Sequence, residues 1–145
     1  PGESEVEMSE VEGIVSSSKY VNEPAQGYVE YSNIGWIWND IPKALELARK
    51  EDKLVLLDFW ASWCGWCIKA DKETFPDSRV EGIIKKYYIA VKIDHDRYKE
   101  LAVEYGIRGL PTVVILDKEG NVKGRIVGFR KAEEFANLLA GFLGK

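Results

Sequence analysis

Two cysteines separated by two residues, Cys64 and Cys67, are the only cysteines in a chain of 145 residues. A thiolate is the attacking species in disulfide exchange, and a second thiol within reach can displace the mixed disulfide that forms. The pair therefore predicts reversible two-electron chemistry that needs no bound cofactor. A purely structural bridge is a weaker interpretation, because so small a closed loop contributes little stability.

A metal site is another interpretation of the same spacing. Zinc sites also use Cys-x-x-Cys pairs, but they require about four ligands. His95 is the only histidine of the chain and the only one that could join the two cysteines, so we predict no bound metal. We expect His95 to lie at the surface without a catalytic task, and the lack of a helper histidine also argues against a cysteine–histidine hydrolase.

The cysteines follow a short apolar run and begin a predicted helix. Residues 53–60 (KLVLLDFW) are interrupted only by Asp58, as is typical of a strand buried on both faces. At the start of the next helix, predicted over residues 64–73, free N–H groups and the helix dipole favour a thiolate at Cys64. Burial raises the pKa of a carboxyl group, which would suit Asp58 for proton transfer. Alternatively, Asp58 reaches water or caps a helix.

Helices and strands alternate along the rest of the chain. We predict helices over residues 41–51, 78–87, 97–105 and 131–143, and strands over residues 88–94, 112–117 and 121–127. The last two strands are joined by a hairpin turn, whereas the earlier alternation implies parallel β-α-β units. The sequence therefore predicts an α/β fold with a central mixed sheet and helices on both faces.

Charge is unevenly distributed along the chain. The net charge is −4, but residues 1–30 hold seven acidic residues and one Lys, a balance of −6 that leaves +2 for residues 31–145. We predict an acidic, flexible extension or tether over residues 1–30, with some β structure around Tyr28–Tyr31, and a folded domain over residues 31–145. No cluster of Lys and Arg indicates nucleic acid as a partner.

Three ordered segments resemble the thioredoxin family. Residues 58–67 (DFWASWCGWC) are similar to the thioredoxin active-site segment, and residues 105–112 (YGIRGLPT) to a second thioredoxin stretch. Val127-Gly128 after the hairpin is the third match, so the resemblance covers about residues 36–145. It implies the thioredoxin fold and a thiol–disulfide oxidoreductase whose redox group is the Cys64–Cys67 disulfide.

The resemblance also implies roles for single residues. Cys64 would be the exposed attacking thiol, Cys67 the resolving thiol, and Asp58 the buried carboxylate that exchanges a proton with Cys67. Leu110-Pro111 would carry a cis peptide bond opposite the cysteines and offer backbone groups of Leu110 to a substrate strand. The implied substrate-binding residues are Trp63, Gly65, Trp66, Gly109, Leu110, Pro111 and Gly128.

Two departures from thioredoxin bear on these roles. Trp66 stands where thioredoxin has Pro, and it enlarges the apolar rim around the cysteines. Lys92 is a candidate for the lysine that often neighbours the buried carboxylate, but residues 92–96 align with thioredoxin in two registers. The helix after Cys67 and the lead-in over residues 36–53 look more like the C-terminal reductase domain of the DsbD family.

The DsbD resemblance implies partners, a direction and a location. We expect protein disulfides as substrates and an upstream dithiol donor, either a reductase or a membrane electron transporter, so that the protein acts as a reductant. Exported or membrane-tethered relatives favour a place outside the cytoplasm; a signal or anchor could have been trimmed, since the chain begins with Pro1. We expect a monomer. The alternative function is a protein-binding module with an incidental cysteine pair.

Overall fold

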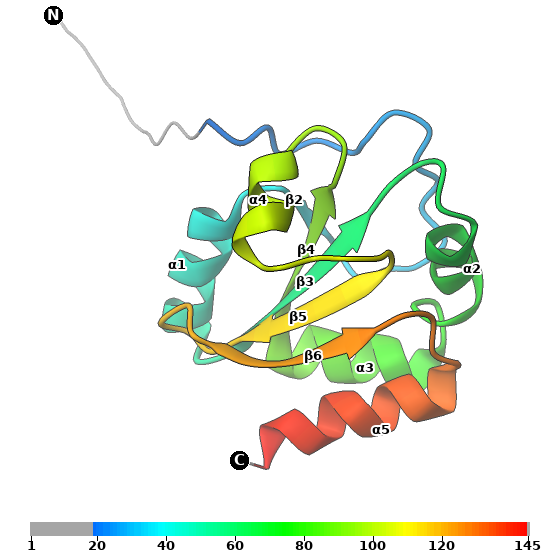
Figure 1. Cartoon of the computed structure of the whole chain (residues 1–145). Coiled ribbons are helices and arrows are strands. Elements are labelled where there is room, and N and C mark those ends of the chain that lie inside the picture. The colour runs from blue at the N-terminus through cyan, green and yellow to red at the C-terminus, as the bar shows by residue number, and fades with distance from the viewer. Residues whose placement is uncertain (1–18, 145) are drawn as a thin grey trace, which may run out of the picture.

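The computed structural model describes residues 19–144, whose centre is a five-stranded sheet in the order β2-β4-β3-β5-β6 (Figure 1). The strands are β2 (Ile37–Trp38), β3 (Leu54–Trp60), β4 (Tyr88–Asp94), β5 (Thr112–Leu116) and β6 (Val122–Val127). The helices are α1 (Ile41–Glu51), α2 (Gly65–Glu73), α3 (Ser78–Tyr87), α4 (Lys99–Glu104) and α5 (Ala132–Leu143). None of these helices is long and apolar enough to cross a membrane.

The sheet is mixed, which confirms the predicted fold class. Strands β2, β3 and β4 pair in parallel, whereas β5 runs antiparallel to β3 and β6 antiparallel to β5. The parallel pairing of β3 with β4 places Asp58 directly beside Lys92. Because cross-strand partners point to the same face of a sheet, this register decides which charges meet in the interior.

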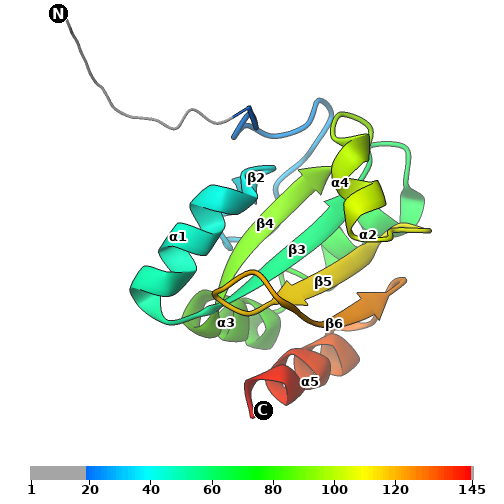
Figure 2. The same ribbon diagram turned by 60° about the vertical axis from the view of Figure 1, so that its left-hand side comes forward.

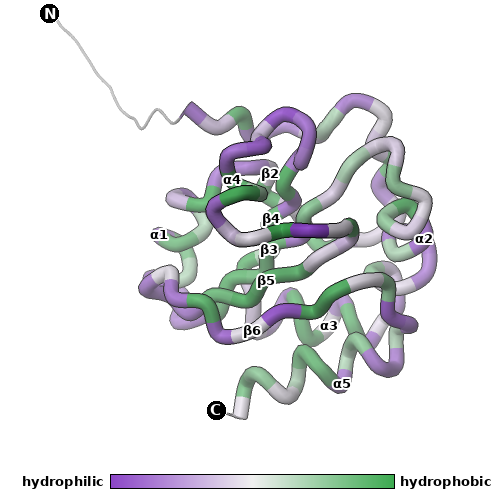
Figure 3. The backbone as a smooth tube through the Cα atoms, viewed as in Figure 1, coloured by the Kyte–Doolittle hydropathy of each residue, from purple (hydrophilic) through white to green (hydrophobic). Residues whose placement is uncertain are grey.

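Side chains alternate along β3 between two apolar layers, formed with the helices that Figure 2 shows on the two faces of the sheet. Val55, Leu57 and Phe59 pack with residues of α1 and α4 in one layer. Leu56 belongs to the other layer, with residues of α3 and α5. Since side chains of a strand alternate, Asp58 faces this second layer as well. The inner strands are mainly hydrophobic in Figure 3, so Asp58 is a charge placed within an apolar layer.

Some element boundaries differ from the predicted ones. The structure has no strand at Tyr28–Tyr31, where we predicted β structure, because the Tyr28 amide turns back to the Ala25 carbonyl at 3.1 Å. The first strand within residues 19–144 is β2 instead, which was not predicted from the sequence. Helix α4 is shorter than the predicted 97–105, because the amides of Arg97 and Tyr98 close a turn on the Asp94 carbonyl.

The predicted acidic extension over residues 1–30 lies largely outside the described residues. Residues 19–30 are described, and they run without regular structure along the folded domain. Ala25 is 8% exposed and belongs to the same buried cluster as the two cysteines. Part of this acidic segment is therefore in contact with the core.

Candidate active site

Cys64 and Cys67 lie where the chain leaves β3 and enters α2. The amide of Cys64 closes a turn on the Ala61 carbonyl at 3.1 Å, and Cys64 is the N-cap of the helix. The two cysteines form a disulfide, and the Cys67 amide donates to Cys64 Sγ at 3.1 Å. Free amides at a helix N-terminus stabilise negative charge, so this position favours the thiolate of Cys64 once the bridge is reduced.

The two cysteine residues differ little in exposure. Cys64 is 5% exposed and Cys67 1%. Cys64 is thus the more accessible of the two, although it is less exposed than the resemblance implied. Tight packing in the oxidised form accounts for this, since both cysteines belong to a cluster that includes Trp38 and Trp60.

The Leu110–Pro111 peptide bond is cis, and Leu110 packs against the cluster that holds the cysteines. The Gly128 amide donates to the Pro111 carbonyl at 2.9 Å, which fixes the loop after β6 against the start of β5. Together these segments line a groove of about 300 Å³. The residues that line it are Trp66, Leu110, Pro111, Gly128 and Phe129.

The groove unites four of the predicted substrate-binding residues and adds Phe129. Phe129 was not among the predicted residues, although it directly follows the Val127-Gly128 match. Its ring centroid lies 5.5 Å from that of Trp66, and Lys69 Nζ lies 5.6 Å from the Phe129 ring. Trp63, Gly65 and Gly109 do not line this groove.

Trp63 forms a separate aromatic surface beside the cysteines. It is 65% exposed, and its indole Nε1 donates to Asp96 Oδ2 at 2.7 Å. His95 Nδ1 lies 3.1 Å from Asp96 Oδ1. These bonds lower the pKa of Asp96, chiefly through His95. The hydrogen bond to Asp96 therefore orients the exposed ring of Trp63.

A buried ion cluster lies behind the cysteines. Lys92 Nζ is 2.6 Å from Asp58 Oδ2 and 2.6 Å from Asp71 Oδ1. Asp71 Oδ2 accepts a bond of 2.8 Å from the indole Nε1 of Trp60. All three charged residues are buried, and Lys92 is wholly inaccessible. One lysine between two carboxylates leaves one negative charge uncompensated when both are ionised.

Burial dominates the proton affinity of this cluster. It raises the pKa of Asp58 above the usual value of 3.8, and the nearby ammonium of Lys92 lowers it by less. Burial likewise raises the pKa of Asp71 to about 6, against the lowering effect of Lys92. Charged forms lose their hydration in the interior, so both carboxylates bind protons more tightly than they would in water.

Asp71 was not predicted as a site residue, and the sequence allows two registers for Lys92. The β3–β4 pairing settles the register, since Lys92 is the partner of Asp58. Asp71 follows Cys67 by four residues, a spacing that puts both on one face of α2. That spacing was the available signal, because the face bearing Cys67 has to be buried.

A small cavity lies beside the buried carboxylate and shares lining residues with the groove. Its volume is about 10 Å³, close to the size of one water molecule. Asp58, Pro111, Gly128 and Phe129 are among the residues that line it. Asp58 therefore lies one small cavity away from the groove beside the disulfide.

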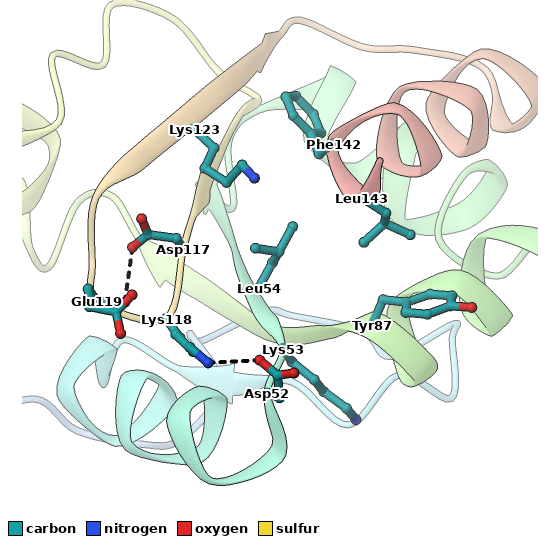
Figure 4. A pocket seen from close by; sticks show the side chains of 10 residues that line it. All are labelled: Asp52, Lys53, Leu54, Tyr87, Asp117, Lys118, Glu119, Lys123, Phe142 and Leu143. Atoms are coloured by element: carbon teal, nitrogen blue, oxygen red, sulfur yellow. Dashed lines mark hydrogen bonds and ion pairs between the residues drawn. The ribbon is translucent and has the colours of Figure 1, made fainter. Parts of the chain in front are cut away.

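A second hollow lies at the other end of the sheet (Figure 4). It measures about 360 Å³, with Leu54 and Phe142 among its apolar lining. Its rim is charged, and Lys118 pairs there with Asp52 at 2.9 Å.

Within residues 19–144, no group of three or more His, Cys, Asp or Glu side chains is placed to hold a metal ion.

Comparisons with known proteins agree with this geometry. The family model of the thioredoxin-like domain matches residues 41–142. Thioredoxin-1 of Drosophila melanogaster is 37% identical over 107 residues, which are 70% of this chain and 89% of that protein. The thiol:disulfide interchange protein DsbD of Pseudoalteromonas atlantica is 30% identical over 103 residues, which are 68% of this chain but 17% of that protein.

Solved structures give the same result. The oxidised C-terminal domain of DsbD from Neisseria meningitidis has a TM-score of 0.61 and 27% sequence identity. The similarity covers 72% of this chain and 97% of that domain. The likeness to DsbD thus concerns one domain of a longer protein.

Proposed function

Because this chain belongs to the thioredoxin-like domain family and is a thiol–disulfide oxidoreductase, we propose that it reduces disulfide bonds of partner proteins. The observation that carries the proposal is the Cys64–Cys67 disulfide at the N-terminus of α2, beside an apolar groove. Proteins of this family use a redox-active disulfide, so the cysteine pair supplies the electrons without another cofactor.

The exchange proceeds in two balanced steps. The Cys64 thiolate attacks one sulfur of the partner's disulfide, which forms a mixed disulfide and releases the other sulfur as a thiolate. The Cys67 thiolate then attacks Cys64 Sγ, closes the Cys64–Cys67 bridge and releases the second partner sulfur. The partner gains two electrons and takes up two protons, and a dithiol donor reduces the cysteine pair for the next cycle.

Asp58 is the proton acceptor for Cys67 in this proposal. A carboxylate with a raised pKa can take up a proton near neutral pH, and Asp58 is buried in the layer that α2 covers. Lys92 holds its carboxylate at 2.6 Å. The small cavity between Asp58 and Pro111 offers a path by which the proton leaves toward the groove.

The groove and the exposed tryptophans form the docking surface in this proposal. Trp66 and Phe129 supply an apolar wall, and the cis Leu110–Pro111 segment runs along the same groove. An extended segment of the partner would lie there with its disulfide against Cys64. Trp63, Gly65 and Gly109, which lie outside the groove, would contact the partner around its rim.

The donor and the location follow from the DsbD resemblance. The chain spans less than a fifth of the Pseudoalteromonas atlantica DsbD that it matches. We propose an upstream dithiol donor, either a reductase or a membrane electron transporter, and a place outside the cytoplasm. We also propose that the protein acts as a monomer.

Reduction of insulin disulfides by dithiothreitol tests the proposal. The wild-type protein should accelerate insulin precipitation, and Cys64→Ser should reduce the rate to that of dithiothreitol alone. Cys67→Ser should instead accumulate a covalent adduct with the substrate, because Cys64 attacks but nothing resolves the mixed disulfide. If Cys64→Ser keeps its turnover, the mechanism is wrong; if the wild-type protein binds substrate without turnover, the protein is a docking module.

A further inference from the structure

The segment of residues 20–36 precedes the family-matched region and is nevertheless fixed to the domain. The Val21 amide donates to Tyr98 Oη at 2.7 Å, and Asn39 Nδ2 donates to the Val21 carbonyl at 2.8 Å. Asn22 Oδ1 accepts the Trp38 amide at 2.8 Å, on the edge of the sheet. These bonds tie the segment to α4, to the start of α1 and to β2.

The anchored segment lies over the buried ion cluster. The Tyr28 ring packs edge-on against Trp38 and Trp60, with centroid distances of 4.9 Å and 5.5 Å. Lys92 Nζ lies 5.4 Å from the centroid of the Tyr28 ring and 4.5 Å from that of Trp36. Two aromatic rings from this segment therefore face the ammonium that holds both carboxylates.

The tryptophan at position 36 supports the view that this segment covers the ion cluster. Its indole Nε1 is buried without a hydrogen-bond partner among the described residues. Such a group costs roughly 1–3 kcal/mol. The ring nonetheless contacts Lys92 and also Phe75, whose ring centroid is 5.0 Å away. Contact between an aromatic face and a desolvated ammonium offsets part of that cost.

The electrostatics of the cluster depend on this cover. An ion pair in the interior interacts far more strongly than one in water, and its carboxylates lose their hydration. Burial of Tyr28 itself raises its phenol pKa, with further contributions from the charge of Asp71, from Glu30, which accepts the Tyr28 hydroxyl at 3.1 Å, and least from the charge of Asp58. The phenol therefore lies close enough to both carboxylates to sense them.

We propose that residues 20–36 complete the redox site, and that Tyr28 is a positioning residue whose ring excludes water from Asp58, Lys92 and Asp71. The inference rests on the proposed function in one respect, that Asp58 exchanges a proton with Cys67. Without the ring, water reaches the cluster and Asp58 gives up its proton more readily. The part of the chain before the matched family domain thus sets the pH at which Asp58 accepts a proton.

Several charged or titratable groups face Asp58. Lys92 on β4 pairs with Asp58 directly, and Asp71 on α2 pairs with Lys92. Tyr28 lies on the covering segment, with its ring over Lys92. Arg130 lines the same small cavity, but its guanidinium is bonded to Glu134 and to the Val127 carbonyl. Tyr28 can be replaced without changing a formal charge among these groups.

Carboxyl NMR of the reduced protein and the pH profile of insulin reduction test the inference together. Tyr28→Ala should shift the Asp58 titration to lower pH by about one unit, and the acidic limb of kcat/KM should move with it. Tyr28→Phe keeps the ring and should stay at the wild-type values. Tyr31→Ala is the matched control, because Tyr31 belongs to the same segment but is 45% exposed.

The outcomes separate the two proposals. An Asp58 titration that moves while the kcat/KM profile stays fixed supports the cover and contradicts the proposed role of Asp58 in proton transfer. An Asp58 titration that stays fixed in a folded Tyr28→Ala protein overturns the inference. If that variant does not fold, Tyr28→Leu replaces it, with a smaller shift in the same direction expected and the absence of any shift overturning the inference.

Discussion

At the carboxyl end of β3, three charged side chains are buried and two tryptophans are exposed, whereas the charged side chains at its amino end lie at the surface. Asp58, Lys92 and Asp71 are hidden behind the disulfide, and Trp63 and Trp66 face solvent. Around Leu54, acids and lysines form a rim at the surface and Phe142 is partly buried against α3, α5 and β6 neighbours (Figure 4).

The two ends of β3 differ in whether their charged side chains follow the usual preference for the surface. Folding favours solvated charges, which is what the amino end of β3 shows. At the carboxyl end, charges are buried and apolar rings are exposed next to a reactive disulfide, although both arrangements are unfavourable for folding. Reversal of the usual preference therefore marks the site independently of the cysteine motif.

The largest expected effect comes from removing the central ammonium at the buried end. Lys92→Met leaves two carboxylates uncompensated in the interior and should lower the free energy of unfolding by about 3–5 kcal/mol. Urea unfolding of the oxidised protein measures this loss. The triple variant Asp58→Asn/Lys92→Met/Asp71→Asn removes every charge of the cluster and should regain much of the loss; if it is no more stable than Lys92→Met, unpaired charge is not the cause.

A pH-dependent effect of similar origin is expected at Asp71. Its pKa is about 6 in the folded protein against an ordinary 3.8, so the folded state binds this proton more tightly than the unfolded state. The contribution of this proton to the free energy of unfolding is fully present below about pH 4. It declines as the pH rises to about 6 and is lost at higher pH. About two pH units correspond to a change of up to about 3 kcal/mol.

Urea unfolding between pH 4 and 7 checks this sign. The stability of the wild-type protein relative to Asp71→Asn should decline as the pH rises from about 4 to 6. Glu73→Gln, on the exposed side of the same helix, is the control. Parallel curves for wild type and Asp71→Asn would show that burial does not govern the proton affinity of Asp71.

A smaller effect is expected from the exposed aromatic rings at the two ends of β3, and it concerns substrate binding instead of stability. Trp66→Ala should raise KM for a protein disulfide about 5- to 30-fold, equivalent to 1–2 kcal/mol of lost contact, with a smaller change in kcat. Trp66 is 59% exposed, so the unfolding midpoint should change little. Tyr87→Ala is the control, since Tyr87 is an exposed ring at the opposite hollow. Equal effects on KM would contradict a docking role for the groove.

The sequence predicted what depends on local pattern. The cysteine spacing, the apolar run of β3 and its interrupting Asp58 sufficed to locate the disulfide and one buried carboxylate. Asp71 could not be predicted in the same way, because an acidic residue on a helix is ordinarily solvated. Its four-residue spacing from Cys67 was the one local signal for the buried face of α2, and the packing of α2 onto the sheet places it there.

The contacts of residues 20–36 were also beyond the sequence. An acidic, glycine-containing segment without periodicity is typical of a flexible tether, and Tyr28 gives no sign there of its partners. Its ring contacts are with Trp38, Trp60 and Lys92, which lie ten or more residues further along the chain. Tertiary contacts of this kind decide burial, and they follow from topology more than from local composition.

The smallest effect is expected for the surface pair Asp52–Lys118, which is the exposed counterpart of the buried pair Asp58–Lys92. It joins the same two chemical groups as Asp58 and Lys92, at 2.9 Å instead of 2.6 Å, but its carboxylate side chain is 85% exposed. Lys118 lowers the pKa of Asp52, so any stabilisation is present above about pH 4 and is lost as the pH falls further. In a double-mutant cycle, Asp52→Ala and Lys118→Ala should be additive and leave insulin reduction unchanged, because water and salt screen the pair. A coupling energy as large as that between Asp58 and Lys92 would mean that burial does not distinguish the two ends of β3.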